Sequence, residues 1–164
     1  MDKKLRKHEN ILVNSGGGVI LFAVWGVAKV NLYMGLSSSF LGELKKTAVE
    51  NGMDANLIVA IMGVIAALIL LWQLCTRLYI GINAIAEGKG KNKGWAYLVM
   101  TGFFLVTDIQ SQWQILVVNF MHNWAGFNIN MPVAFLLEMV SVYGLVELLV
   151  SGIWVKKLRK MGKE

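Results

Sequence analysis

The sequence feature that most constrains the fold is an uncharged run from Ala55 to Thr76, ANLIVAIMGVIAALILLWQLCT. An α-helix needs about 20 apolar residues to cross the hydrocarbon core of a bilayer, and this run is long enough. In a soluble protein, other chain would have to cover a helix that is apolar on every side. In lipid, such a helix satisfies its own backbone hydrogen bonds and needs no cover. The run therefore predicts a transmembrane helix in an integral membrane protein.

The composition also favours a membrane protein over a soluble one. Hydrophobic residues make up 56% of the 164 residues, charged residues make up only 16%, and there are six tryptophans. The mean hydropathy is +0.57. These values are unusual for a soluble domain of this size. We expect a single membrane domain over residues 1–164, with no separate soluble domain.

Four apolar stretches are long enough to form spans, and we place them at about residues 12–34, 57–79, 96–118 and 133–155. Four consecutive spans with short connections favour an all-α, antiparallel bundle of four transmembrane helices. On the first span, glycines and a phenylalanine share one face, where small residues would let a neighbouring helix approach closely. The residues of this expected contact face are Gly18, Phe22 and Gly26.

The connection between the first two spans is the longest and most polar. Its apolar residues recur at helical spacing, with serines at its start and Asn51-Gly52 at its end. Serine suits a helix N-cap, and Asn-Gly suits a left-handed helix stop. These features predict a short amphipathic helix on the extracytoplasmic surface, at about residues 39–51.

The distribution of lysine and arginine predicts the orientation of the spans. The amino terminus, the turn at 88–94 and the carboxyl terminus are strongly basic, whereas the other two connections carry only Lys45, Lys46 and the titratable His122. Because basic loops stay on the cytoplasmic side, both termini should face the cytoplasm. We therefore expect a multi-pass protein of the cell membrane.

Several classes of function lack their sequence signatures. The net charge of +6 comes from short segments beside apolar runs, so we expect no nucleic-acid partner. Cys75 is the only cysteine, which excludes an intrachain disulfide and a cysteine zinc site. The turn at 88–94 lacks the residue order of a phosphate-binding loop. His8 and His122 lie at or beyond the membrane edge, so we expect no metal and no other cofactor. No motif indicates an enzyme.

Charged residues within the spans are the candidates for a functional role. Insertion scales assign about 2.5–3.5 kcal/mol to a lysine, arginine or aspartate at the centre of a span, so each needs a partner or a purpose. With a rise of about 1.5 Å per residue, Lys29 and Glu138 lie at the same depth, roughly 25 Å from the cytoplasmic edge. We expect them to form an ion pair. Asp108 lies near the midplane, whereas Arg77 lies close enough to the edge to extend its guanidinium to the headgroups.

Glu147 requires a separate explanation. At about 100° per residue, Glu138 and Glu147 lie on opposite faces of the fourth span. If Glu138 turns inward, Glu147 must face another helix, a second subunit or a water-filled groove. We therefore expect a homo-oligomer, or a membrane-protein partner, at this face. The full set of candidate residues within the spans is Lys29, Gln73, Arg77, Asp108, Gln112, Glu138 and Glu147.

These charged and polar residues support two hypotheses about function. In the first, they fix helix packing, and the protein is a structural or assembly subunit of a membrane complex. In the second, the carboxylates and the amide-rich third span form a route for protons or small cations through an oligomeric channel or transporter, since carboxylates inside membranes commonly mark such routes. A membrane enzyme with acid–base carboxylates is a third and weaker alternative.

Overall fold

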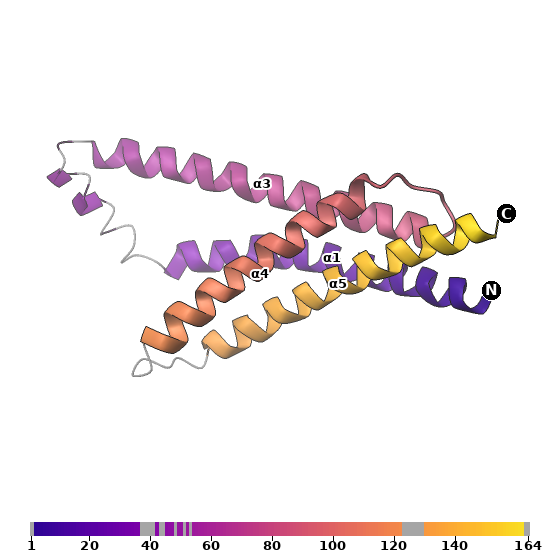
Figure 1. Ribbon diagram of the computed structural model, residues 1–164. Coiled ribbons are helices and arrows are strands. Elements are labelled where there is room, and N and C mark those ends of the chain that lie inside the picture. The colour runs from indigo at the N-terminus through magenta and orange to yellow at the C-terminus, as the bar shows by residue number, and fades with distance from the viewer. Residues whose placement is uncertain are drawn as a thin grey trace. The chain divides into compact units, whose positions relative to one another are not determined.

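The computed structural model describes residues 2–36, 42, 45–47, 49–50, 52, 54–122 and 130–162, with side chains described in these ranges except at 2, 29–36, 111, 114–122 and 130–135. The long helices are α1 (Asp2–Leu36), α3 (Ala55–Gly88), α4 (Ala96–His122) and α5 (Asn130–Met161) (Figure 1). No β-strand occurs in the described ranges. The predicted all-α class is confirmed.

Within the described residues, three helices contain segments that are long and apolar enough to cross a membrane. These segments are Lys3–Ala28, Ala55–Gly88 and Leu136–Met161, and α4 contributes the described apolar stretch Ala96–Gln110. Large apolar side chains lie on the surface of these helices; Trp72, for example, is 64% exposed and Val99 is 70% exposed. Apolar surface of this extent is unfavourable in water and suits contact with lipid. Helix length and surface together support the predicted membrane class.

The chain divides into two compact units, one formed by Met1–Ile20 with Leu78–Glu164 and the other by Leu21–Arg77. In the second unit, the Asp54 carboxylate caps α3 by accepting a hydrogen bond from the backbone N–H of Asn56 at 2.9 Å. Asparagine and aspartate are favoured at this position because they satisfy N–H groups that lack a helical partner.

The stop predicted at Asn51-Gly52 has the expected backbone geometry at its glycine. Gly52 has a φ of +68°, and its N–H donates to the carbonyl of Val49 at 3.0 Å. Glycine adopts this left-handed conformation without the penalty that a Cβ would bring. Most of the amphipathic helix expected at 39–51 lies outside the described residues, so it stays a prediction.

The larger unit, Met1–Ile20 with Leu78–Glu164, has a core to which all four helices contribute. The α4 and α5 helices run antiparallel and pack against each other. The start of α1, the turn after α3 and the end of α5 meet at one end of this unit (Figure 1). We call this the basic end. The buried core residues are Leu12, Val19, Ile80, Ala84, Tyr97, Leu98, Phe104, Leu145, Leu148 and Val155.

Glycines bring α1 and the end of α3 into close contact. A Cβ placed on Gly81 would lie 2.5 Å from a side-chain carbon of Ile20 and 2.7 Å from the carbonyl oxygen of Gly16. A Cβ placed on Gly88 would lie 2.6 Å from the carbonyl oxygen of Glu9. Only glycine fits at such separations, and small residues commonly mediate close packing of membrane helices.

The contact glycine of α1 in the larger unit differs from the expected one. A Cβ on Gly18 would meet no described atom within 4 Å, whereas one on Gly16 would lie 2.9 Å from the carbonyl oxygen of Gly81. Gly16 and Gly18 point to different faces of the helix, because residues two apart are not neighbours on a helix surface. The contact of α1 with the end of α3 is therefore made at Gly16.

Candidate functional site

The turn after α3 shapes the basic end. The N–H of Gly90 donates to the carbonyl of Glu87, and the N–H of Lys91 donates to the carbonyl of Ala86, each at 3.0 Å. Gly90 has a φ of +90°. This pair of bonds with a left-handed glycine is a Schellman motif, which satisfies carbonyls that the helix end leaves without partners. The motif turns the chain sharply toward α4.

Glu87, in the last turn of α3, is the most buried charged residue of the described chain. Its side chain is 0% exposed, and its Oε1 lies 3.0 Å from Nζ of Lys156, whose side chain is 10% exposed. Tyr97 has its hydroxyl in the same region, where it interacts electrostatically with the Glu87 carboxylate without hydrogen-bond geometry. Burying an unpaired carboxylate would cost free energy, and the ion pair with Lys156 offsets that cost for Glu87.

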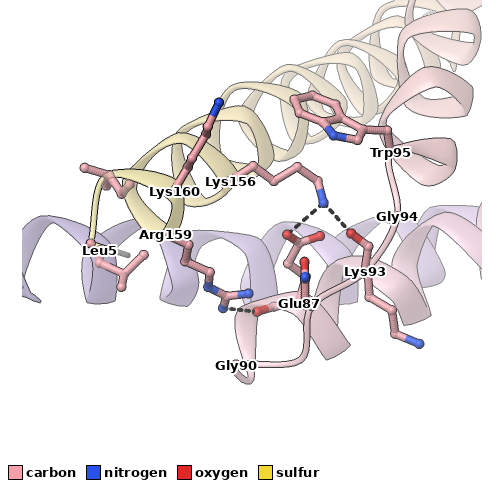
Figure 2. Close-up of a pocket in the computed structure, with 12 residues that line it drawn as sticks. Leu5, Glu87, Gly90, Lys93, Gly94, Trp95, Lys156, Arg159 and Lys160 are labelled. Atoms are coloured by element: carbon pink, nitrogen blue, oxygen red, sulfur yellow. Dashed lines mark hydrogen bonds and ion pairs between the residues drawn. The ribbon is translucent and has the colours of Figure 1, made fainter. Parts of the chain in front are cut away.

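Lys156 also links two other elements of the basic end. Its ammonium donates to the carbonyl of Lys93 in the turn and lies 5.3 Å from the ring centroid of Trp95. The ring of Tyr97 is 5.7 Å from the same nitrogen. Figure 2 shows the ammonium between the Glu87 carboxylate, the Lys93 carbonyl and the Trp95 ring. A cation within about 6 Å of aromatic faces gains further electrostatic stabilisation.

Arg159 joins the first helix to the last. Its guanidinium donates to Oε1 of Glu9 in α1 at 2.7 Å and to the backbone carbonyl of Glu87 at 2.7 Å. A longer bond, at 3.3 Å, reaches the carbonyl of Lys91. The guanidinium presents several donors in a fixed plane, which suits this simultaneous contact with three segments. We refer to Glu9, Glu87, Lys156 and Arg159 as the ionic cluster.

A second contact between α1 and α5 lies next to the ionic cluster. The imidazole of His8 stacks on the indole of Trp154, with centroids 5.9 Å apart and planes 8° from parallel. Its Nδ1 is 3.5 Å from Oγ of Ser151. Nζ of Lys157 lies 5.3 Å from the centroid of the Trp154 ring. Lys157 therefore lies against the Trp154 ring, whereas Lys156 pairs with the Glu87 carboxylate.

An open pocket of about 1010 Å³ lies between the turn, α5 and the start of α1 at the basic end. Small-molecule pockets typically have volumes of about 300–1,000 Å³. Four basic side chains and a single carboxylate, Glu87, contribute to its lining (Figure 2). Lys93, Trp95, Lys156, Arg159 and Lys160 are among the residues that line it.

Glu147, a residue predicted to need a partner, has two in its own chain. Its Oε2 accepts a hydrogen bond from Oγ of Ser15 in α1 at 3.2 Å. Its Oε1 accepts another from the hydroxyl of Tyr143, one turn earlier in α5, at 2.7 Å. Both carboxylate oxygens therefore bond within the larger unit, and one of the bonds joins two helices.

For four other predicted residues, the structure describes the burial of each side chain and does not bring them into one site. The side chains of Arg77, Asp108 and Glu138 are partly buried, and each has an interaction partner. Gln73 is exposed. The side chain of Lys29 lies outside the described residues, so its ion pair with Glu138 stays a prediction.

Gln112, in α4, differs from the other predicted polar residues. It is 6% exposed, and its Oε1 has no hydrogen-bond partner in the described part of the chain. Thr101, which lies on the same helix, is fully buried, and its hydroxyl donates to the carbonyl of Tyr97 at 2.7 Å. The polar side of α4 thus faces inward at both positions.

Sequence reasoning missed the ionic cluster, because it searched for costly charges only within the spans. One signal was present. Glu87 follows Ile80 and Ala84 at the spacing of one helix face, and both of those residues are fully buried. A carboxylate that continues a buried apolar face needs a cation nearby. The sequence does not identify that cation among the many lysines and arginines of the flanking segments.

No family model, curated protein or solved structure matches this chain. The fold defines its class: over the residues that the structure describes, it is a helical protein with three helices long and apolar enough to span a membrane.

Proposed function

We propose that the protein is a structural or assembly subunit of a membrane complex, with four spans, both termini in the cytoplasm and a location in the cell membrane. The observation that carries this proposal is the use of carboxylates as links between helices. Glu147 joins α5 to α1 through Ser15, and Glu87 joins α3 to α5 through Lys156. Groups engaged in this way fix helix positions and have little freedom to bind and release an ion.

The assembly partner in this proposal is a second copy of the chain or another membrane protein. The α5 helix has an exposed apolar face beside Glu147, with Val146 39% exposed and Val150 46% exposed. We expect cysteines at either position, in a variant without Cys75, to crosslink into dimers or higher species in native membranes. Monomers alone at both positions would contradict an interface at this face.

Proton or small-cation conduction is the competing function, and one observation favours it. The buried Oε1 of Gln112 lacks a described partner, as a group lining a hydrated path would. In proteoliposomes, the assembly proposal predicts no proton or potassium flux above that of empty vesicles. Flux that Glu147→Gln abolishes would contradict the assembly proposal and support conduction.

The proposed topology predicts the accessibility of single cysteines. In intact cells expressing a variant without Cys75, a cysteine at position 91 should resist a membrane-impermeant thiol reagent, because the basic turn stays in the cytoplasm. A cysteine at position 42 should react from outside. Gel-shift labelling measures both. If position 91 reacts from outside, the proposed orientation is wrong. If neither position reacts, the two connections do not lie on opposite sides of the membrane.

A further inference from the structure

One face of α4 is apolar and exposed over most of its described length. Val99, Phe103 and Val106 recur on it at helical spacing, with exposed fractions of 70%, 63% and 64%. Thr101 and Gln112, on the opposite side of the same helix, are buried. The packing of α4 within the larger unit therefore leaves this apolar face uncovered.

A tryptophan lies at each end of the exposed face of α4. Trp95 is 58% exposed and Trp113 is 67% exposed. The carbonyl of Trp95 accepts hydrogen bonds from the N–H groups of Leu98 and Val99, so Trp95 belongs to the first turn of the helix. Eighteen residues separate the two tryptophans, which is about five turns, so they lie on the same side of α4 and about 27 Å apart along its axis. The hydrocarbon core of a bilayer is about 30 Å thick.

The polar residues between the two tryptophans are compatible with a lipid environment. The hydroxyl of Thr107 donates to the carbonyl of Phe104 at 2.9 Å, so its hydrogen bond is made within the helix. Gln110 is exposed, but it lies about 4.5 Å along the axis from the second tryptophan, where its amide can reach the headgroup layer. Asp108, the only charged residue in this stretch, is partly buried and has an interaction partner.

A third tryptophan, Trp154 of α5, lies level with the start of α4. Two contacts establish this level: a Cβ placed on Gly152 would lie 2.5 Å from a side-chain carbon of Leu98, and Nζ of Lys156 lies 5.3 Å from the ring centroid of Trp95. Trp154 lies between Gly152 and Lys156 in the sequence and is 43% exposed. Tryptophan is enriched where membrane helices meet the headgroup layer, and two neighbouring helices carry one at the same level.

The charges beside these two tryptophans complement a layer of lipid phosphates. The turn before Trp95 contains three lysines, and Lys156 and Lys157 follow Trp154 closely in α5. Between Trp95 and Lys156, the sequence contains no lysine or arginine. Nζ of Lys157 lies 5.3 Å from the centroid of the Trp154 ring. Cations next to an aromatic belt lie at the depth of the phosphate groups, which are negatively charged.

We propose that the exposed face of α4 is a lipid-contact surface, with Trp95 and Trp113 at the two edges of the hydrocarbon core. The assembly partner of the proposed function then lies at α5, whose exposed face carries the hydrogen bond between Tyr143 and Glu147. Glu147 lies about 10 Å along the axis from Trp154, inside the hydrocarbon core, where a protein covers polar groups better than lipid does. The lipid-contact surface rests on the proposed membrane insertion and adds to it the side of the fold that lipid covers.

The test is the accessibility of nitroxide spin labels on the full-length protein in vesicles of phosphatidylcholine and phosphatidylglycerol. Oxygen concentrates in the hydrocarbon core, whereas a water-soluble nickel chelate is excluded from it. The ratio of oxygen to nickel collision rates should be highest for labels near the middle of the exposed face and should fall severalfold toward both tryptophan positions. Single labels are attached, in a variant without Cys75, at Trp95→Cys, Val99→Cys, Phe103→Cys, Val106→Cys and Trp113→Cys.

Phe104→Cys provides the matched control for Phe103→Cys. The two positions are adjacent and lie at the same depth, but Phe104 is 6% exposed and Phe103 is 63% exposed. A label at position 104 should collide with oxygen less often, because other helices cover it. Labels at 103 and 106 that are as shielded from both reagents as the label at 104 would mean that protein covers this face, which overturns the proposal. A maximum of the ratio at 95 or 113 would also overturn it, because the tryptophans would not mark the edges.

Crosslinking in native membranes supplies a measurement that needs no label at a buried position. Phe103→Cys and Val106→Cys should stay monomeric, and dimers trapped at either position would overturn the lipid-contact surface. Failure of the proposed function gives a different result: nickel chelate would reach positions 103 and 106 as readily as position 95, which would contradict membrane insertion itself. An inserted protein whose α4 face is shielded from oxygen contradicts only the lipid-contact surface.

Discussion

Lys156→Met is expected to lower the free energy of unfolding by about 3–5 kcal/mol, because it leaves the buried carboxylate of Glu87 without a cation. The size of the effect follows from burial: Glu87 is 0% exposed and Lys156 only 10% exposed, so water cannot replace the lost partner. The substitution also removes the bond to the Lys93 carbonyl. Thermal unfolding in a mild detergent, followed by tryptophan fluorescence, measures the loss.

The double variant Lys156→Met with Glu87→Leu tests the cause of this loss. Replacing both members of a buried ion pair by apolar groups is often nearly neutral, so we expect it to recover most of the stability lost in the single variant. Lys157→Met, which changes the adjacent exposed lysine, should have little effect. Equal losses in the single and double variants would mean that Glu87 does not depend on Lys156.

Gly81→Ala is expected to destabilise the protein by about 1–3 kcal/mol, because the new methyl group overpacks the contact of α3 with α1. The added Cβ would lie 2.7 Å from the carbonyl oxygen of Gly16, and backbone cannot move aside as a flexible side chain can. The unfavourable contact outweighs the gain in helix propensity of about 0.8–1.0 kcal/mol that alanine brings over glycine.

Gly17→Ala provides the matched control for Gly81→Ala. A Cβ at Gly17 would meet no described atom within 4 Å, so only the propensity term operates, and the variant should be unchanged or slightly more stable. The same thermal measurement serves for both. A Gly81→Ala protein as stable as the Gly17→Ala protein would show that α1 and the end of α3 do not pack as closely as described.

The sequence predicted the helices better than their ends. The uncharged run at 55–76 correctly indicated α3, but the helix continues to Gly88, well past the expected limit near residue 79. The length of an apolar run reflects the thickness of the hydrocarbon core that the helix must cross. A helix can continue past the surface of the bilayer, so this length does not determine where the helix ends. The end is set locally, by the glycine at position 90 and its Schellman motif.

The candidate site was harder to predict, for a different reason. Matching charged residues by depth assigns partners only to residues within the spans, and it led to the prediction that Lys29 pairs with Glu138, which stays a prediction. The ionic cluster lies outside the predicted spans. There, lysines and arginines are expected simply because they orient the protein in the membrane, so none of them stands out as a partner for Glu87. Its specificity depends on which side chains the packing at Gly16 and Gly81 brings together, and helix periodicity from one sequence does not determine that packing.

The ionic cluster also makes the order of synthesis matter. The chain emerges from its amino terminus, so α1 and α3 are complete before Lys156 and Arg159 exist. Until then, Glu87 has neither its cation nor the guanidinium that holds its backbone to Glu9, and its carboxylate favours the aqueous surface over the helix interface. The packing of α1 against the end of α3 at Glu87 therefore depends on the last helix, and a chain that stops before residue 156 leaves the Glu87 carboxylate without the cation that its burial requires.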